Sequence, residues 1–405
     1  MNFFHLITQL EAGFLIQDFA VVMIVAAIMV FVTHKLKQPM VIGYILAGML
    51  IGPFTPPFSL VHNVGTINTL AELGIIILLF VIGTEFPITK LRSVGRISMI
   101  VGIAESLGTL LVTFFVARTL GFSQFDSMFL ALAMSVTSTV VTVKLLEELN
   151  MINDKSSVLI MGILIVEDVI VITMLGILQS LSLTAAVSFV DVLLSVAIVL
   201  GFIAAILILG SRYLPPLIDK LARTTDYSVL IIVILGLAFG LSFVAIELGL
   251  SPVIGAFLAG VLVAESNSAG IARVITIPLR DVFTALFFVS VGALVDVSKI
   301  PLFIIPALIL IVTSFMAKMI IIIPVLIRAG YDTTTAVRTG LGLASARGEM
   351  SLIVGKGGQD VGAVSSYILP ILGVVTIVTT FATPYILKIG TKLNISSSPS
   401  EDNKS

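Results

Sequence analysis

Two adjacent acids, Glu167 and Asp168, stand inside the apolar segment GILIVEDVIVITML (162–175) and are the only charged residues between Val158 and Leu178. A charge at the centre of a membrane span costs roughly 2.5–3.5 kcal/mol, so two ionised and unpaired acids cost on the order of 5–7 kcal/mol. Burial disfavours the charged form of a carboxyl group, which favours binding and release of a proton at cellular pH. The acids therefore predict a proton carrier, and the alternative is a buried ion pair that only fixes helix packing.

Two basic residues also fall within apolar segments, Lys318 in TSFMAKMII and Arg347 in SARGE. Neighbours on a helix are about 100° apart, so Glu167 and Asp168 are expected to face different groups. One acid could hold Lys318 while the other faces a cavity. Arg347 keeps its proton in practice, so we expect it to support a helix break or to pair with Glu349 or Glu105.

The composition predicts a membrane protein that crosses the bilayer many times. Hydrophobic residues make up 58% of the chain and charged residues 11%, and the mean hydropathy is +1.20. A soluble domain has about 25% charged residues. The net charge of −1 gives no basic surface for nucleic acid, and the lack of cysteine excludes disulfides and thiol catalysis.

Apolar runs long enough to cross roughly 30 Å of hydrocarbon predict an all-α fold with about thirteen spans. We expect a transmembrane domain at 1–390, without a cleaved signal peptide, and a short polar cytoplasmic tail at 391–405. The predicted spans are 17–34, 39–56, 68–85, 97–117, 126–147, 157–179, 187–211, 228–247, 252–264, 278–295, 301–327, 334–356 and 364–388.

The distribution of Lys and Arg predicts an N-terminus outside and a C-terminus in the cytoplasm, because short cytoplasmic loops retain basic residues. With that orientation, 17 of the 22 basic residues fall on inward connections, Lys144, Arg212, Lys220 and Arg273 among them. The outward connections hold three, which are Arg118, Lys299 and Lys356.

An internal repeat suggests two halves of opposite topology. VIGYILAGML (41–50) and VIGAFLAGVL (253–262) are identical at seven of ten positions and fall in the second and ninth predicted spans. Seven crossings separate them, so the copies are predicted to run in opposite directions, as in the inverted repeats of secondary transporters. Chance similarity between two helices rich in small residues is the alternative.

The same symmetry pairs the fifth predicted span with the twelfth. The fifth carries SVTSTVVT (135–142) and the twelfth carries TGLGLASARGEMS (339–351). Polar or glycine-interrupted segments at matching positions predict two broken helices that serve an ion site. The alternative for the fifth span is a continuous helix in which Ser and Thr bond back to the preceding turn.

Two other classes of protein compete with a carrier. An intramembrane enzyme is disfavoured because the chain has no HExxH, GxSxG or nucleotide-binding loop, so transport is expected to be driven by an ion gradient. A channel would show pore-lining rings repeated by subunits rather than an inverted repeat within one chain. We expect no cofactor.

Four segments resemble the monovalent cation:proton antiporter-2 family, which includes sodium/proton antiporters and Kef-type potassium/proton antiporters. The resemblance covers nearly all of residues 17–390 and implies a homodimer in a prokaryotic cell membrane, with a dimerisation part and an ion-binding core. The segments are LKQPMVIGYILAGMLIGP (36–53), LAELGIIILLFVIGTEF (70–86), LSPVIGAFLAGVLVAES (250–266) and LFFVSVGALVD (286–296).

The resemblance also implies roles for single residues. Asp168 would bind the cation and the proton, with Thr137 and Ser138 at the unwound point as further Na⁺ ligands. Lys318 would pair with Glu167, while Arg347 and Glu349 would support the other broken helix. Sodium/proton relatives commonly have two aspartates at this position, and the Kef type has glutamine before the aspartate. This chain has Glu167 there, which matches neither pattern. The choice of transported cation, Na⁺ (or Li⁺) or K⁺, therefore stays open.

Overall fold

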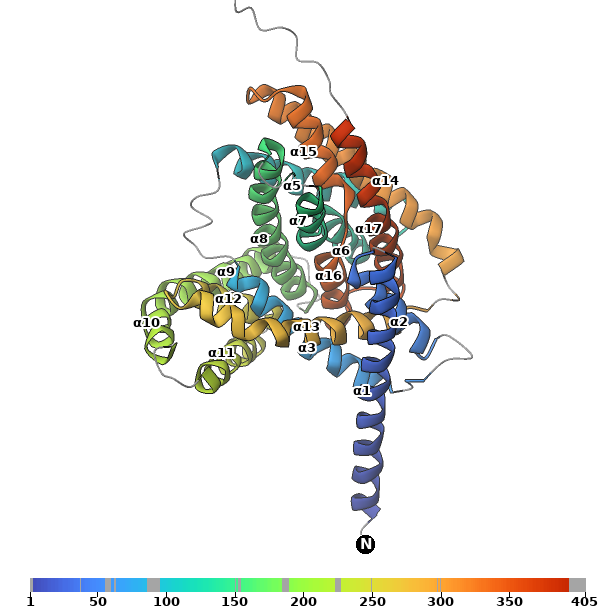
Figure 1. Ribbon diagram of the computed structural model, residues 1–405, viewed down its shortest axis with the longest axis vertical. Coiled ribbons are helices and arrows are strands. Elements are labelled where there is room, and N and C mark those ends of the chain that lie inside the picture. Colours follow the sequence, from blue (N-terminus) through green and yellow to red (C-terminus); the bar gives the residue numbers. More distant parts are fainter. Residues whose placement is uncertain are drawn as a thin grey trace, which may run out of the picture. The chain divides into compact units, whose positions relative to one another are not determined.

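The computed structural model of this protein is helical throughout the part of the chain that it describes (Figure 1). It describes residues 3–36, 38–54, 60–61, 63–85, 95–149, 151, 154–183, 189–222, 227–248, 250–296, 298 and 300–392. The predicted polar tail lies outside these residues except for its first two positions.

The helices follow one another with short connections and no strand in the described ranges. They are α1 (Phe3–Lys35), α2 (Met40–Ile51), α3 (Val64–Thr84), α5 (Arg96–Thr119), α6 (Gln124–Ser135), α7 (Thr139–Glu148), α8 (Lys155–Leu183), α9 (Phe189–Ala205), the π-helical turn η1 (Ile206–Gly210), α10 (Ser211–Ala222), α11 (Tyr227–Glu247), α12 (Pro252–Ala264), α13 (Ala269–Ala293), α14 (Ile300–Arg328), α15 (Thr333–Ser345), α16 (Glu349–Asp360) and α17 (Ile368–Lys392).

The helices confirm an all-α protein that crosses a membrane many times. Within the described residues, ten segments are long and apolar enough to span a bilayer, and the segment Gln124–Leu146 contains the short helices α6 and α7. Two shorter apolar helices, α2 and α12, carry the repeated sequence. The number of thirteen spans stays a prediction.

Several predicted boundaries are wrong because charged residues end a hydrophobic run without ending the helix. Arg212 and Lys220 are predicted on an inward connection but lie in α10, and Arg273, also predicted on an inward connection, lies in α13. Lys356 is predicted on an outward connection, yet it lies in α16 with 1% of its surface exposed, beside the carboxylate of Asp360. Long basic side chains extend to a polar environment while their helix continues, so hydropathy alone misplaces such ends.

The chain forms two compact units, each built from three separated stretches. The first unit contains residues 1–90, 175–303 and 356–373, and the second contains 91–174, 304–355 and 374–405. Whether they correspond to the dimerisation and core parts implied by the resemblance stays a prediction.

In the first unit, α2 packs on α13 and α12 packs on α3, and both contacts depend on glycine. A Cβ atom on Gly48 would lie 2.0 Å from the carbonyl oxygen of Val289, and one on Gly260 would lie 2.0 Å from that of Phe80. Gly48 and Gly260 occupy the same position in the repeated sequence. The two copies therefore pack in the same way, each against the backbone of another helix, while their opposite direction stays a prediction.

The second unit has a core to which five of its helices contribute. Val101 of α5, Leu146 of α7, Ile163 of α8, Ile322 of α14 and Leu343 of α15 belong to one buried cluster. This core includes α8 and α14, which carry Glu167, Asp168 and Lys318, and also α7 and α15, which border the two breaks described next.

Two helical spans of the second unit are interrupted, as the sequence predicts (Figure 1). The first break, Val136–Ser138, separates α6 from α7, and the second, Ala346–Gly348, separates α15 from α16. The backbone of Val136 and of Ala346 is extended in each break. The alternative of a continuous helix with Ser and Thr bonding backward is thereby excluded for the fifth span.

We expect Gly260→Ala to destabilise the protein by about 1–3 kcal/mol, as overpacking does elsewhere, because the new methyl group meets backbone atoms of α3. Thermal unfolding of the purified protein measures the change. Gly240→Ala in α11 is the matched control, since no atom lies within 4 Å of its added Cβ. Equal melting temperatures for the two variants would contradict the packing described here.

Candidate ion-binding site

The two breaks of the second unit cross in direct contact. The amide of Ser138 donates a hydrogen bond to the carbonyl of Ala346, with N and O 3.1 Å apart. A Cβ atom on Gly348 would lie 2.3 Å from Oγ of Ser138, so the crossing has no room for a side chain at that position. The hydroxyl of Ser351 in α16 also donates to the carbonyl of Ala133 in α6, at 2.7 Å. The crossing thus joins the two interrupted spans by backbone and side-chain bonds.

Glu167 of α8 holds the first break in place. The amide of Thr137 donates to Oε2 of Glu167 at 2.7 Å, and this backbone group would otherwise have lost its helical partner. The hydroxyl of Thr137 lies 3.2 Å from Oε1 of Glu167 and 2.6 Å from the carbonyl oxygen of Leu343 in α15. A hydroxyl has one proton, so the shorter contact to Leu343 takes it. The first break is therefore tied to both α8 and α15.

Lys318 of α14 lies between two carboxyl groups. Its Nζ atom is 3.0 Å from Oε1 of Glu167 and 3.0 Å from Oε2 of Glu105, and it donates to the hydroxyl of Thr137 at 2.8 Å. All three charged side chains have 0% of their surface exposed. The sequence suggested the contact between Lys318 and Glu167, but it did not suggest Glu105 as a second partner.

Asp168 faces a different group from its neighbour, as expected from helix geometry. The hydroxyl of Thr139 donates to Oδ2 of Asp168 at 3.0 Å, and Asp168 is 3% exposed. Thr139 is the first residue of α7, so the Asp168 carboxylate lies at the N-terminus of a short helix. A helix N-terminus favours negative charge.

Ser138 and Glu349 form another contact across the crossing. The hydroxyl of Ser138 donates to Oε2 of Glu349 at 3.0 Å, and Glu349 is the first residue of α16. Each of the two short helices that follow a break thus has a carboxylate at its N-terminus. The Na⁺ ligands expected from the sequence bond to other acids, Thr137 to Glu167 and Ser138 to Glu349. The hydroxyl that donates to Asp168 is that of Thr139. Thr139 lies in SVTSTVVT, but the sequence analysis did not select it.

Arg347 supports the second break from inside it. Its amide donates to Oγ1 of Thr379 and its carbonyl accepts from Oγ1 of Thr380, both at 3.0 Å. Its guanidinium donates to Oγ of Ser314 at 3.2 Å and to the carbonyl of Ala346 at 3.2 Å. The sequence left two roles open for Arg347, support of a helix break or pairing with an acid. These contacts correspond to support of the break.

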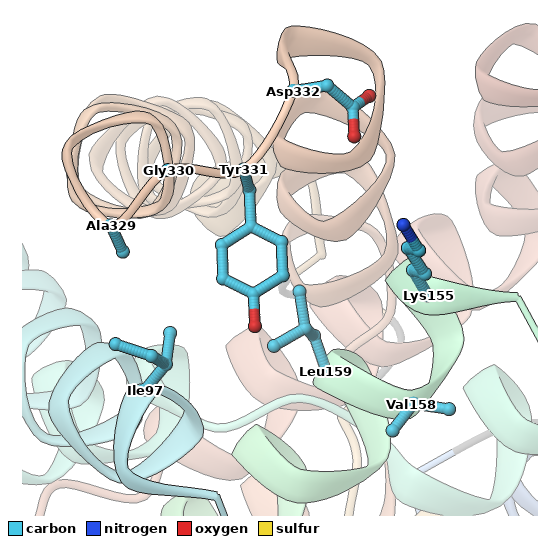
Figure 2. Close-up of a pocket in the computed structure, with 8 residues that line it drawn as sticks. All are labelled: Ile97, Lys155, Val158, Leu159, Ala329, Gly330, Tyr331 and Asp332. Carbon is cyan, nitrogen blue, oxygen red and sulfur yellow. The ribbon is translucent and has the colours of Figure 1, made fainter.

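A hollow of about 550 Å³ lies elsewhere in the second unit, around the turn that joins α14 to α15 (Figure 2). Tyr331 and Leu159 line it, and Lys155 and Asp332 stand at its rim. Asp332 caps α15, and hydrogen bonds from the amide and hydroxyl of Thr335 hold the pKa of its carboxyl below the ordinary value. None of the predicted site residues lines this hollow.

Two crossing broken helices with acids at the crossing define the class of ion-coupled membrane transporters. Residues 20–391 match the family described as "Sodium/hydrogen exchanger, transmembrane", and the chain belongs to this family. This is a family of transporters and not of enzymes, and the match confirms the resemblance seen in the sequence.

Individual relatives agree with this assignment. YbaL of Escherichia coli (strain K12), named as a candidate cation/proton antiporter, is 32% identical over 68% of this chain, which spans about half of the length of YbaL. The ammonium/H⁺ antiporter subunit AmhT of Alkalihalophilus pseudofirmus is 30% identical, and the match covers 80% of this chain and 81% of AmhT. The sodium proton antiporter MjNhaP1 of Methanocaldococcus jannaschii has the same fold, with a TM-score of 0.69, 17% identity and coverage of 95% of this chain and 99% of that chain.

We expect Lys318→Ala to lower the melting temperature strongly, because it leaves buried carboxyl groups without their ammonium partner, a change that costs about 3–5 kcal/mol elsewhere. Adding Glu167→Gln should restore part of the loss. Thermal unfolding of wild type, both single variants and the double variant measures this coupling, and Lys144→Ala, at an exposed position in the same unit, is the control. Strictly additive losses would show that the contact contributes nothing.

Proposed function

We propose that this protein is a secondary active transporter that exchanges a monovalent cation, Na⁺ or Li⁺, for H⁺. The observation that carries the proposal is the crossing itself, where Asp168 lies against the first residue of α7 and beside a neighbour already neutralised by Lys318. Family membership supports the same reaction. In this proposal, one carboxylate binds either the cation or the proton, but not both at once. Because the two ions compete for the same group, the flux of one is coupled to the flux of the other.

Asp168 is a better candidate for the exchanging group than Glu167 because of what each carboxylate bonds to. Glu167 accepts a backbone amide and an ammonium group, and both would have to be given up to bind a cation. Asp168 accepts the hydroxyl of Thr139, and a hydroxyl oxygen can also coordinate a cation. We therefore propose Asp168 as the cation ligand, assisted by Thr139 and by the hydroxyls of Thr137 and Ser138 at the break.

The wider setting belongs to the same proposal. Alternating access needs only a movement of the ion-binding part around a fixed site. The protein would act as a homodimer in a prokaryotic cell membrane, with its N-terminus outside and its C-terminus in the cytoplasm. The second candidate function is a K⁺/H⁺ antiporter of the Kef type. The acid before Asp168 is Glu167 and not the aspartate common in sodium/proton relatives, so selectivity for K⁺ stays open. The candidate from another class of protein is a cation channel.

The experiment that tests the function is a panel of cations. The full chain is reconstituted in liposomes with a pH-sensitive dye and an imposed proton gradient, and Na⁺, Li⁺ or K⁺ is added outside. We expect Na⁺ and Li⁺ to collapse the gradient. A response to K⁺ alone would establish the second candidate, cation flux that moves no protons would establish a channel, and no response to any cation would refute the proposal.

Asp168→Asn should fold and insert but exchange nothing, because it keeps the size of the side chain and removes the ionisable group. Competition also predicts that the apparent affinity of the wild type for the cation rises with pH until Asp168 is deprotonated. Liposome exchange and cation binding at several pH values measure both effects. Asp281→Asn, at an exposed position paired with Arg280 in α13, is the matched control, and exchange by Asp168→Asn near the wild-type rate would place the site elsewhere.

A further inference from the structure

The crossing region carries more buried acids than bases. Four carboxyl side chains lie there with at most 4% exposure, against two cationic side chains that are equally buried. If all six of these described side chains were ionised, together they would carry a net charge of −2 away from water, which is costly. The acids are Glu105, Glu167, Asp168 and Glu349, and the bases are Lys318 and Arg347.

Three of the four acids have contacts that stabilise the ionised form. Glu167 accepts the amide of Thr137 and the ammonium of Lys318. Glu349 begins α16 and accepts the hydroxyl of Ser138, and Asp168 accepts the hydroxyl of the first residue of α7. Hydrogen bonds to a carboxylate and the N-terminus of a helix both favour negative charge.

The ionised form of Glu105 has fewer stabilising contacts, because it lies beside Lys318 but accepts no backbone amide from the described residues. It lies in the interior of α5, far from either helix end, and its Oε1 accepts only a bond of 3.2 Å from the hydroxyl of Ser106 in the described contacts. Its Oε2 is 3.0 Å from Nζ of Lys318 but forms no aligned hydrogen bond with any described group, while the ammonium donates to Glu167 and Thr137. The guanidinium of Arg347, the other buried cation of the crossing, donates to Ser314 and to the carbonyl of Ala346.

The carboxyl groups of Glu105 and Glu167 also share one ammonium group, since each has an oxygen 3.0 Å from Nζ of Lys318. Two ionised carboxylates beside one ammonium would leave a net negative charge out of water, and a proton on either carboxylate removes it. Because Glu167 has the better acceptor contacts, the proton belongs on Glu105.

We propose that Glu105 is a second proton-binding residue of this site, holding a proton while Lys318 pairs with Glu167 and replacing Glu167 as the ionised partner of Lys318 when that carboxylate is lost. The exchange of partners breaks the O–H bond of Glu105, releases its proton to water and leaves a carboxylate beside the ammonium. The proposal deepens the function proposed above and rests on it only in assigning Asp168 to the exchange.

The buried face of α5 provides polar groups next to this proton. Thr109 and Thr113 follow Glu105 at intervals of four residues, so the three side chains lie on one face of the helix. Both threonines are fully buried, and their hydroxyls have no hydrogen-bond partner in the described part of the chain. Hydroxyls both donate and accept, so this buried face offers polar groups on the same side of α5 as Glu105.

Infrared spectroscopy tests the proposal directly, because a protonated carboxylic acid has a carbonyl absorption that a carboxylate lacks. The purified full-length Asp168→Asn protein is used as background, so that Asp168 cannot contribute. We expect a carboxylic acid band near neutral pH that disappears on adding Glu105→Gln and persists on adding Glu349→Gln. No band in the background, or an unchanged band with Glu105→Gln, would overturn the proposal.

A stability cycle tests the exchange of partners independently. Glu105→Gln and Glu167→Gln should each lower the melting temperature modestly, and together they should lower it by more than the sum, since only the double variant leaves Lys318 without a carboxylate. Pairing Glu167→Gln with Glu349→Gln is the control and should be additive. If the double variant does not fold, adding Lys318→Met should recover the protein, and failure to recover it, like additive losses, counts against the proposal.

The two tests separate this inference from the proposed function. Neither reads transport, and the spectra are recorded without Asp168. If Asp168→Asn still exchanges ions, the assignment of Asp168 fails while the band of Glu105 retains its meaning. If the band is absent while Asp168→Asn is inactive, the inference about Glu105 fails and the proposed function stands.

Discussion

The second unit depends on satisfying the backbone where two helices stop inside an apolar environment. Each break releases amides and carbonyls that no water can satisfy in hydrocarbon, and each such group costs several kcal/mol. Some backbone groups of one break bond to the other break, as the amide of Ser138 does to the carbonyl of Ala346. Others bond to side chains. Glu167 accepts the amide of Thr137, and Thr379 and Thr380 bond to the backbone of Arg347. The polar residues of the site are thus first of all the partners of an interrupted backbone.

That requirement explains why neighbouring acids have different surroundings. Successive residues of α8 point about 100° apart, so one acid reaches the break and the lysine while the other reaches the start of α7. The lysine supplies a full positive charge to Glu167, whereas a helix N-terminus supplies about half a charge to Asp168. The two carboxylates therefore lie in different electrostatic surroundings.

The sequence predicts the features that contrast with their surroundings. Adjacent acids, a lysine and a glycine-flanked arginine stand out in apolar runs, and hydroxyl-rich or glycine-rich stretches at matching positions indicate the breaks. It could not identify Glu105 as a partner of Lys318, because a contact between α5 and α14 depends on the rotation of both helices. Nor could it choose Thr139 over Thr137 and Ser138, since unwinding three residues removes the periodicity that relates position to direction.

Glu105 gives the buried Lys318 a second carboxyl partner in addition to Glu167. An ammonium with one carboxylate is a closed pair, and separating it exposes two charges at once. An ammonium with two carboxyl groups at 3.0 Å can lose either one and still keep an ionised partner, provided that a proton moves on or off the other. The cost of disturbing Glu167 and the break it holds is then reduced to the cost of moving one proton. If the site rearranges around Asp168 as proposed, this second carboxyl group lowers the cost of the movement while Lys318 stays buried.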